Sequence, residues 1–253
     1  MTLRLVSLLC GLLLVAGLLG TALGPPLLRV GHFSAQSPSD TLPDGWEQIR
    51  FGENDASTSY RLVRAESTVV VRARSDNGAS GLITQTRVDL EKHPVLEWRW
   101  KVKTLPKGAD VAAKTADDAA ARLYVTFDYD GLGLYDRLKL MLLRRVGYAE
   151  APSRALNYLW TTSRPPGDAL PSAYTDQIMM LPVRSGSTQV GTWVRERRNV
   201  LEDYRTVFGE DPPPVNGVVI MTDSDNTATS AEALYGDILF RTDGARAVSL
   251  ETN

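Results

Sequence analysis

The residues best suited to binding a ligand lie on two segments whose alternating side chains predict β-strands. In Ala120–Tyr129 the apolar residues alternate with polar ones, and in Ala155–Thr162 two aromatic residues share a face. Sheets hold sugar rings in this way, because aromatic faces stack on the ring while charged neighbours fix its orientation. The pattern therefore predicts a ligand-binding site, with a glycan as the candidate ligand. The alternative for Tyr158 and Trp160 is that they pack in the core. The six candidate residues are Asp118, Arg122, Tyr124, Asp128, Tyr158 and Trp160.

A second candidate site is the acidic stretch Asp223-Ser224-Asp225-Asn226-Thr227. Alternate carboxylates beside an amide are oxygen ligands of the kind that Ca²⁺ prefers. The stretch lacks the glycine and the distal glutamate of an EF-hand loop, so that motif is absent. The alternative is a polar turn in which Asp and Asn side chains bond to the local backbone. Apart from this Ca²⁺ hypothesis, we predict no cofactor.

The sequence contains no recognisable catalytic motif. Its two histidines, His32 and His93, have no partner at metal-ligand spacing, and there is no phosphate-binding loop, dinucleotide fingerprint or His-Glu-x-x-His. Carboxylates are plentiful, however, and a glycosidase needs only two that face each other about 5–10 Å apart. Asp118 and Asp128 flank one predicted strand, so a carboxylate-based glycan-cleaving enzyme stays open as an alternative.

Composition and charge narrow the class of partner. The 253 residues are 43% hydrophobic and 23% charged, which is ordinary globular composition. With 28 basic and 30 acidic residues, the formal net charge is −2. That balance gives no electrostatic case for nucleic acid, since nucleic-acid-binding domains are typically basic.

The N-terminus has the pattern of an export signal. Arg4 precedes an uncharged apolar run from Leu5 to Leu19, and Gly20-Thr21-Ala22 supplies the small residues that signal peptidase requires. We predict a signal peptide over residues 1–22, cleaved after Ala22, and a periplasmic or extracellular protein. An uncleaved anchor is the alternative, because Leu5–Leu23 approaches the length of a membrane span. No second stretch is long and apolar enough to cross a membrane.

Cys10 lies inside the predicted signal and is the only cysteine. A lipoprotein is not indicated, because Leu9 occupies the place where a small residue must precede the modified cysteine. The mature chain would therefore contain no thiol. That excludes disulfides, cysteine nucleophiles and thiolate metal sites.

The rest of the chain predicts a mainly β fold. Period-two alternation or short apolar runs mark strands in Leu27–Phe33, Ser67–Ser75, Ser80–Leu90, Pro94–Lys103, Thr175–Val183, Val215–Thr222 and Ala233–Phe240, besides the two named above. Asn77-Gly78 and Gly186-Ser187 supply turn residues of the hairpin type. Trp98 and Trp100 share a face with Leu96 and Val102, which predicts that both tryptophans lie in the core. We expect a jelly-roll-like β-sandwich forming one domain over residues 23–253, with an extended segment over 23–45.

Two segments show helical spacing instead. Asn199–Phe208 places Val200, Leu201 and Tyr204 on one stripe, with Asn199 as the predicted N-cap and Gly209 as the stop. Leu134–Val146 fits a helix or a strand equally well. The sandwich should therefore carry one or two short helices.

Several stretches resemble a bacterial family known as domain of unknown function 3047. They are Leu42-Pro43-Asp44-Gly45-Trp46, Leu96-Glu97-Trp98-Arg99-Trp100, Asp117-Asp118 with Arg122-Leu123-Tyr124-Val125, Asn157-Tyr158-Leu159-Trp160, Arg198-Asn199-Val200, Asp203-Tyr204, Phe208-Gly209, Pro212-Pro213 and Thr222–Thr227. The resemblance implies an exported β protein and supplies no activity or catalytic residue. The strand Tyr235-Gly236-Asp237-Ile238 is also similar to the last strand of carbohydrate-binding jelly rolls. That similarity implies that Asp237 helps Asp223 and Asp225 to hold Ca²⁺.

Together these features predict a non-catalytic, ligand-binding β-sandwich of the cell envelope, with a glycan or a small envelope ligand as its partner. One alternative is the glycan-cleaving enzyme described above. The other is a protein-docking module that uses its sheet edges or the Val200–Phe208 helix. The binding hypothesis requires Tyr158 and Trp160 to be exposed on a concave sheet face, and burial of both would remove that stacking surface.

Overall fold

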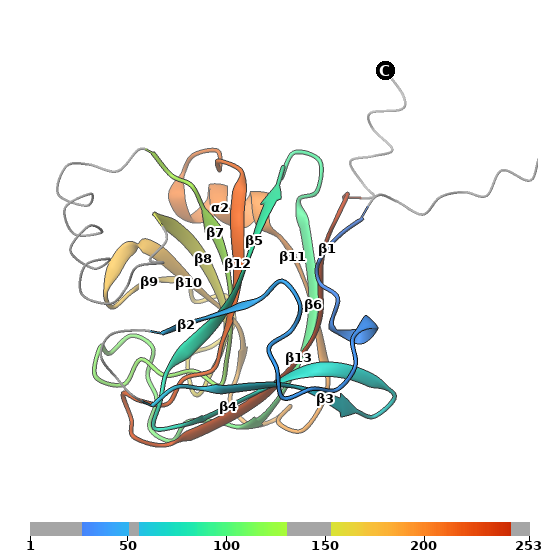
Figure 1. The fold of residues 1–253 in the computed structure, drawn as a ribbon. Helices are drawn as coiled ribbons and strands as arrows, with labels where there is room; N and C mark the ends of the chain where they lie inside the picture. The colour runs from blue at the N-terminus through green and yellow to red at the C-terminus, as the bar shows by residue number, and fades with distance from the viewer. Residues whose placement is uncertain (1–26, 51–55, 131–152, 244–253) are drawn as a thin grey trace, which may run out of the picture.

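The computed structural model describes residues 27–50, 56–130 and 153–243. They form two β-sheets packed face to face, with one short α-helix at one end of the sandwich (Figure 1). The mainly β sandwich that the sequence predicts is therefore confirmed. The predicted signal peptide and the ambiguous segment Leu134–Val146 lie outside the described residues.

The first sheet has six strands, and its central strand is the last one along the chain. Its order is β11 (Val194–Asn199), β6 (Val95–Thr104), β13 (Ser230–Arg241), β4 (Thr68–Asp76) and β3 (Ser59–Ala65). The first half of β13 pairs with β4, and its second half pairs with β1 (Leu27–Gly31). A bulge between Tyr235 and Ile238 marks the change of partner.

The second sheet has seven strands. Its order is β2 (Glu47–Arg50), β5 (Ser80–Val88), β12 (Val215–Met221), β7 (Ala121–Phe127), β8 (Arg154–Thr161), β10 (Thr175–Ser185) and β9 (Leu170–Ser172). β8 and β10 run parallel to each other, whereas the other pairs in this sheet are antiparallel.

Aromatic side chains from both sheets fill the space between them. Trp98 of β6 lies 5.4 Å from the Tyr158 ring of β8, and Trp100 lies 6.2 Å from Trp160, measured between ring centroids. These four rings belong to one continuous buried cluster. The prediction that Trp98 and Trp100 lie in the core is confirmed.

The α-helix α2 (Val200–Phe208) begins and ends where the sequence predicts. The Asn199 side chain accepts a hydrogen bond from the Glu202 amide, and Gly209 closes the helix in the left-handed region at φ 73°. Val200, Leu201 and Tyr204 turn inward and join the core. No helix among the described residues is long and apolar enough to cross a membrane.

The alternation in the sequence misses β2, β3, β9 and β11. β11 contributes only Val194 as an apolar residue, because Arg195 and Arg197 point outward and the second buried residue is Glu196. Glu196 is buried because it accepts hydrogen bonds from the Trp100 indole and the Arg184 guanidinium. A short 3₁₀ turn over Phe33–Ala35 follows β1, so the predicted strand Leu27–Phe33 ends early, at Gly31.

Candidate functional site

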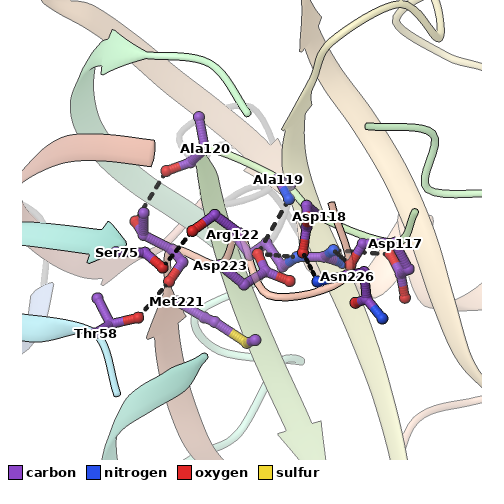
Figure 2. A network of polar contacts seen from close by, with 12 residues as sticks. Thr58, Ser75, Asp117, Asp118, Ala119, Ala120, Arg122, Met221, Asp223 and Asn226 are labelled. Carbon is purple, nitrogen blue, oxygen red and sulfur yellow. Dashed lines mark hydrogen bonds and ion pairs between the residues drawn. The ribbon is translucent and has the colours of Figure 1, made fainter. Parts of the chain in front are cut away.

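A buried cluster of charged residues lies where β7 begins and β12 ends. Arg122 of β7 is 2% exposed, and its Nε donates to Asp223 Oδ1 at 2.9 Å. Its Nη2 donates to the carboxylate and to the carbonyl oxygen of Asp117, at 2.8 and 2.9 Å. Figure 2 shows these contacts beside Asp118 and Asn226. The guanidinium thus joins the loop before β7 to the loop after β12.

Asp118 holds the same two loops together through the backbone. Its side chain is fully buried and accepts hydrogen bonds from the amides of Asn226 and Thr227, at 3.2 and 2.7 Å. The Thr227 hydroxyl donates to it as well. We therefore read Asp118 and Arg122, both predicted to bind a ligand, as residues whose polar groups are already engaged within the protein.

Burial changes the acidity of this cluster. Loss of hydration raises the pKa of Asp223 to about 7, and repulsion from Asp117 adds to the effect. The attraction of Arg122 opposes both influences without cancelling them. Asp223 thus titrates near neutral pH although it touches a permanent cation.

The predicted Ca²⁺ ligands are only partly brought together. Asp118, Asp223 and Asp225 each place one carboxylate oxygen within 4.8 Å of the other two. These are hard oxygen donors, but Asp118 and Asp223 already accept protein N–H groups and Arg122 places a cation beside them. Ca²⁺ binding by Asp223 and Asp225 stays a prediction.

The inclusion of Asp237 among these ligands is wrong. Asp237 lies in the bulge of β13 on the six-stranded sheet, and its Oδ1 accepts the Ser34 amide at 2.8 Å. The Ser34 hydroxyl donates to the other carboxylate oxygen. The side chain therefore fixes the 3₁₀ turn after β1 and is not part of the Asp118, Asp223 and Asp225 group.

The exposure expected of Tyr158 and Trp160 is also wrong. They are 0% and 1% exposed and face the tryptophans of β6. The Tyr158 hydroxyl donates to Asp203 at 2.8 Å, and the Trp160 indole donates to the Gly186 carbonyl at 3.0 Å. The reason is that every residue of β8 is buried, so alternation along this strand does not distinguish the core face from the opposite face.

The two remaining candidates lie apart from each other. Tyr124 is partly buried on the outer face of the seven-stranded sheet, where its hydroxyl lies 4.0 Å from Met221 Sδ. Burial raises the pKa of Tyr124, so the phenol stays a neutral donor. Asp128 follows the end of β7 and is exposed.

Sequence reasoning missed Asn157, which lies beside Tyr124 on the same outer face. Asn157 is directly opposite Tyr124 on β7 and Met180 on β10. It is 1% exposed, yet neither its Nδ2 nor its Oδ1 has a hydrogen-bond partner among the residues that the structure describes. The signal in the sequence was a lone amide between leucine and tyrosine, in a strand otherwise rich in apolar residues.

The geometry defines a two-sheet β-sandwich whose seven-stranded sheet carries a buried charged cluster and, next to it, an unpaired amide. The chain belongs to the family described as "Protein of unknown function (DUF3047)", whose model matches residues 44–239. The resemblance seen in the sequence is therefore confirmed. No curated protein matches the chain.

Three solved structures that match this chain do so at low sequence identity and with TM-scores of 0.40 or less. The chain is similar to the xyloglucanase domain of NopAA from Sinorhizobium fredii, with 9% identity, TM-score 0.40, and coverage of 80% of this chain and 95% of that one. A family 30 carbohydrate-binding module from Clostridium thermocellum has 9% identity, TM-score 0.35, and coverage of 87% and 99%. Tailspike protein 4 of bacteriophage CBA120 has 8% identity and TM-score 0.38; the match covers 83% of this chain but only 20% of the tailspike chain.

Proposed function

We propose that the protein binds a polyhydroxylated ligand, a glycan in the first instance, on the outer face of its seven-stranded sheet around Asn157 and Tyr124. It does so without cleaving the ligand, in the periplasm or outside the cell. The observation that supports the proposal is the buried Asn157 amide, neither of whose polar atoms is paired with any described residue.

The unpaired amide is costly in the free protein. A buried polar group without a hydrogen bond destabilises the fold by about 1–3 kcal/mol, and native proteins contain few such groups. A sugar presents adjacent hydroxyl groups that both donate and accept. One such pair matches the Nδ2–H and Oδ1 of a single amide, so ligand binding would recover the lost hydrogen bonds.

The neighbours of Asn157 suit this chemistry. Tyr124 is directly opposite Asn157 on β7 and is only partly buried. Its ring offers an apolar face for stacking, and Met180 and Met221 add polarisable thioethers at the edges. Of the six site residues that the sequence predicts, Tyr124 takes part in this arrangement.

The alternatives have less support from the described residues. Asp118 and Asp223 have the proximity of a catalytic pair, and Asp223 has a raised pKa, but both are buried and already accept protein hydrogen bonds. The exposed large apolar residues in the described part of the chain are Leu28, on β1 of the six-stranded sheet, and Tyr174, in the turn between β9 and β10 of the other sheet, so they form no common docking patch there.

The test is titration calorimetry of the purified protein against a panel of neutral and acidic glycans. We expect one glycan class to bind and Asn157→Leu to weaken binding at least about five-fold, since an unmet polar partner costs about 1–3 kcal/mol. Tyr124→Ala removes the stacking ring and should weaken binding as well. Tyr158→Phe is the matched control, because that hydroxyl faces Asp203 inside the protein. Absence of binding to every glycan, or an equal loss in the control, would overturn the proposal.

A further inference from the structure

The outward face of the six-stranded sheet is strongly basic. Trp98 and Trp100 of β6 point into the core, so the intervening Arg99 and the next residue, Lys101, point outward. Arg195 of β11 is directly opposite Arg99. Lys101 lies in a separate row that crosses β13 at Leu234 and reaches Arg72 of β4. The basic face consists of Arg72, Arg74, Arg99, Lys101, Lys103 and Arg195.

Acidic partners neutralise only part of this basic face. Glu232 is shared between Arg72, at 3.1 Å, and Lys103, at 3.5 Å. Lys101 lies 3.5 Å from Glu66. Among the described residues, no carboxylate forms an ion pair with Arg74, Arg99 or Arg195. The face is therefore positive although the formal charge of the whole chain is −2.

The pairing of Arg99 with Arg195 is unfavourable for the isolated protein. Like charges directly opposite each other on neighbouring strands destabilise a sheet. The surroundings nevertheless hold Arg99 in place: its Cζ lies 4.7 Å from the centroid of the Trp193 ring. Gly236 on β13 leaves the space, because a Cβ there would come within 2.5 Å of Arg99 Cγ. The sheet thus keeps two adjacent cations at its surface.

We propose that this basic face docks the protein onto an anionic phospholipid membrane surface. The cations extend over β4, β6 and β11, with β13 between them, and neighbouring strands are about 4.8 Å apart. That array is broad in two dimensions, as a sheet of lipid phosphates is, and not a single line such as a polymer chain would need. The partly exposed Trp193 lies at the same face, and tryptophan favours the membrane–water interface.

The experiment is co-sedimentation of the purified protein with vesicles of phosphatidylglycerol and phosphatidylcholine, and with phosphatidylcholine alone. We expect binding only to the anionic vesicles, weakening as salt rises through physiological ionic strength. The double variant Arg99→Glu/Arg195→Glu should lose at least about ten-fold in vesicle affinity, because each cation near an anionic surface contributes roughly a factor of five.

The matched control is Arg50→Glu/Arg87→Glu, which makes the same change in charge on exposed arginines of β2 and β5. It should keep its vesicle affinity within about two-fold, since these strands belong to the other sheet. If the glutamate pair on the basic face prevents folding, Arg99→Gln/Arg195→Gln tests the same surface without charge reversal. No binding to anionic vesicles, equal losses in both double variants, or tighter binding to a soluble acidic polysaccharide or to duplex DNA would overturn the proposal.

Discussion

The charged cluster around Arg122 and the amide of Asn157 occupy neighbouring positions on one sheet but differ in how their polar atoms are paired. Arg122 is buried with two carboxylates and a carbonyl around it. Asn157 is buried just as deeply, and neither polar atom of its side chain has a partner in the described part of the chain. The two regions touch through Met180, which lies opposite Asn157 and 4.0 Å from Arg122 Nη1.

This difference in pairing suggests that the Arg122 cluster stabilises the fold, whereas Asn157 is available to bind a ligand. A buried charge whose partners are all protein groups fixes the structure and has little capacity left for a ligand. An unpaired buried amide loses its hydrogen bonds to water and forms none within the protein, so it lowers the stability of the fold. Its presence therefore needs an explanation other than stability. Charge and position in the sequence alone pointed to Arg122, whereas the hydrogen bonds point to Asn157.

The largest expected effect on stability is that of Arg122→Met. The change leaves Asp117 and Asp223 buried without their cation, and such a loss destabilises a fold by about 3–5 kcal/mol. Urea denaturation followed by tryptophan fluorescence measures it. The control is Arg72→Met, which breaks a partly exposed pair with Glu232 and should cost less than about 1 kcal/mol. Similar losses in both variants would show that the cluster is not a structural centre.

The charged cluster should also make the stability of the fold depend on pH. Asp223 has a folded pKa of about 7, above its value in the unfolded chain, so its protonated form favours the folded state. Its contribution is fully present below the unfolded pKa, near 4, and is lost as pH rises towards 7 and through it. We expect the free energy of unfolding, measured in EDTA, to fall over that range.

Asp223→Asn isolates this contribution. The asparagine oxygen can still accept from Arg122 and Ala119, but it does not titrate. The decline between pH 4 and 7 should be shallower in this variant. An unchanged slope would mean that another group sets the pH dependence.

The smallest expected effect is that of Asn157→Leu on stability. Replacing an unpaired buried amide by an apolar side chain of similar size removes a desolvation cost and no hydrogen bond, so stability should stay level or rise by about 1 kcal/mol. Asn216→Leu is the control, since the Asn216 oxygen accepts from Thr126 at 2.6 Å and its loss should cost about 1 kcal/mol. A large loss for Asn157→Leu would indicate that the amide is already paired.

The fold was largely accessible from the sequence because strands with one buried and one open face alternate clearly. Pro94–Lys103 shows this, and β6 follows it closely. The same reasoning failed for β8, because both faces of this strand are buried. The positions of Tyr158 and Trp160 in the sequence therefore do not show which face points into the core. Asn77-Gly78 predicted a turn, and Asn77 does adopt a positive φ of 50°. The turn leads from β4 in one sheet to β5 in the other, which local sequence does not reveal.

The candidate site was less predictable, because it depends on pairings between distant strands. Asp118 and Asp223 come together only since β7 lies beside β12. Asp237 matched a short pattern, but the bulge beside it turns its carboxylate towards Ser34. Whether the Asn157 amide has a hydrogen-bond partner depends on the side chains that surround it in the fold. The sequence alone therefore does not show that this amide is unpaired.

The position of β13 has a consequence for the order in which the chain folds. The six-stranded sheet needs this strand at its centre, against β1, β4 and β6, before most of its long-range pairs exist. A chain emerging from the ribosome therefore cannot complete the sandwich until Ser230–Arg241 has been synthesised. Because the sandwich is completed late, the chain stays unfolded for longer. This suits a protein that we expect to be exported through a translocation pore before it folds.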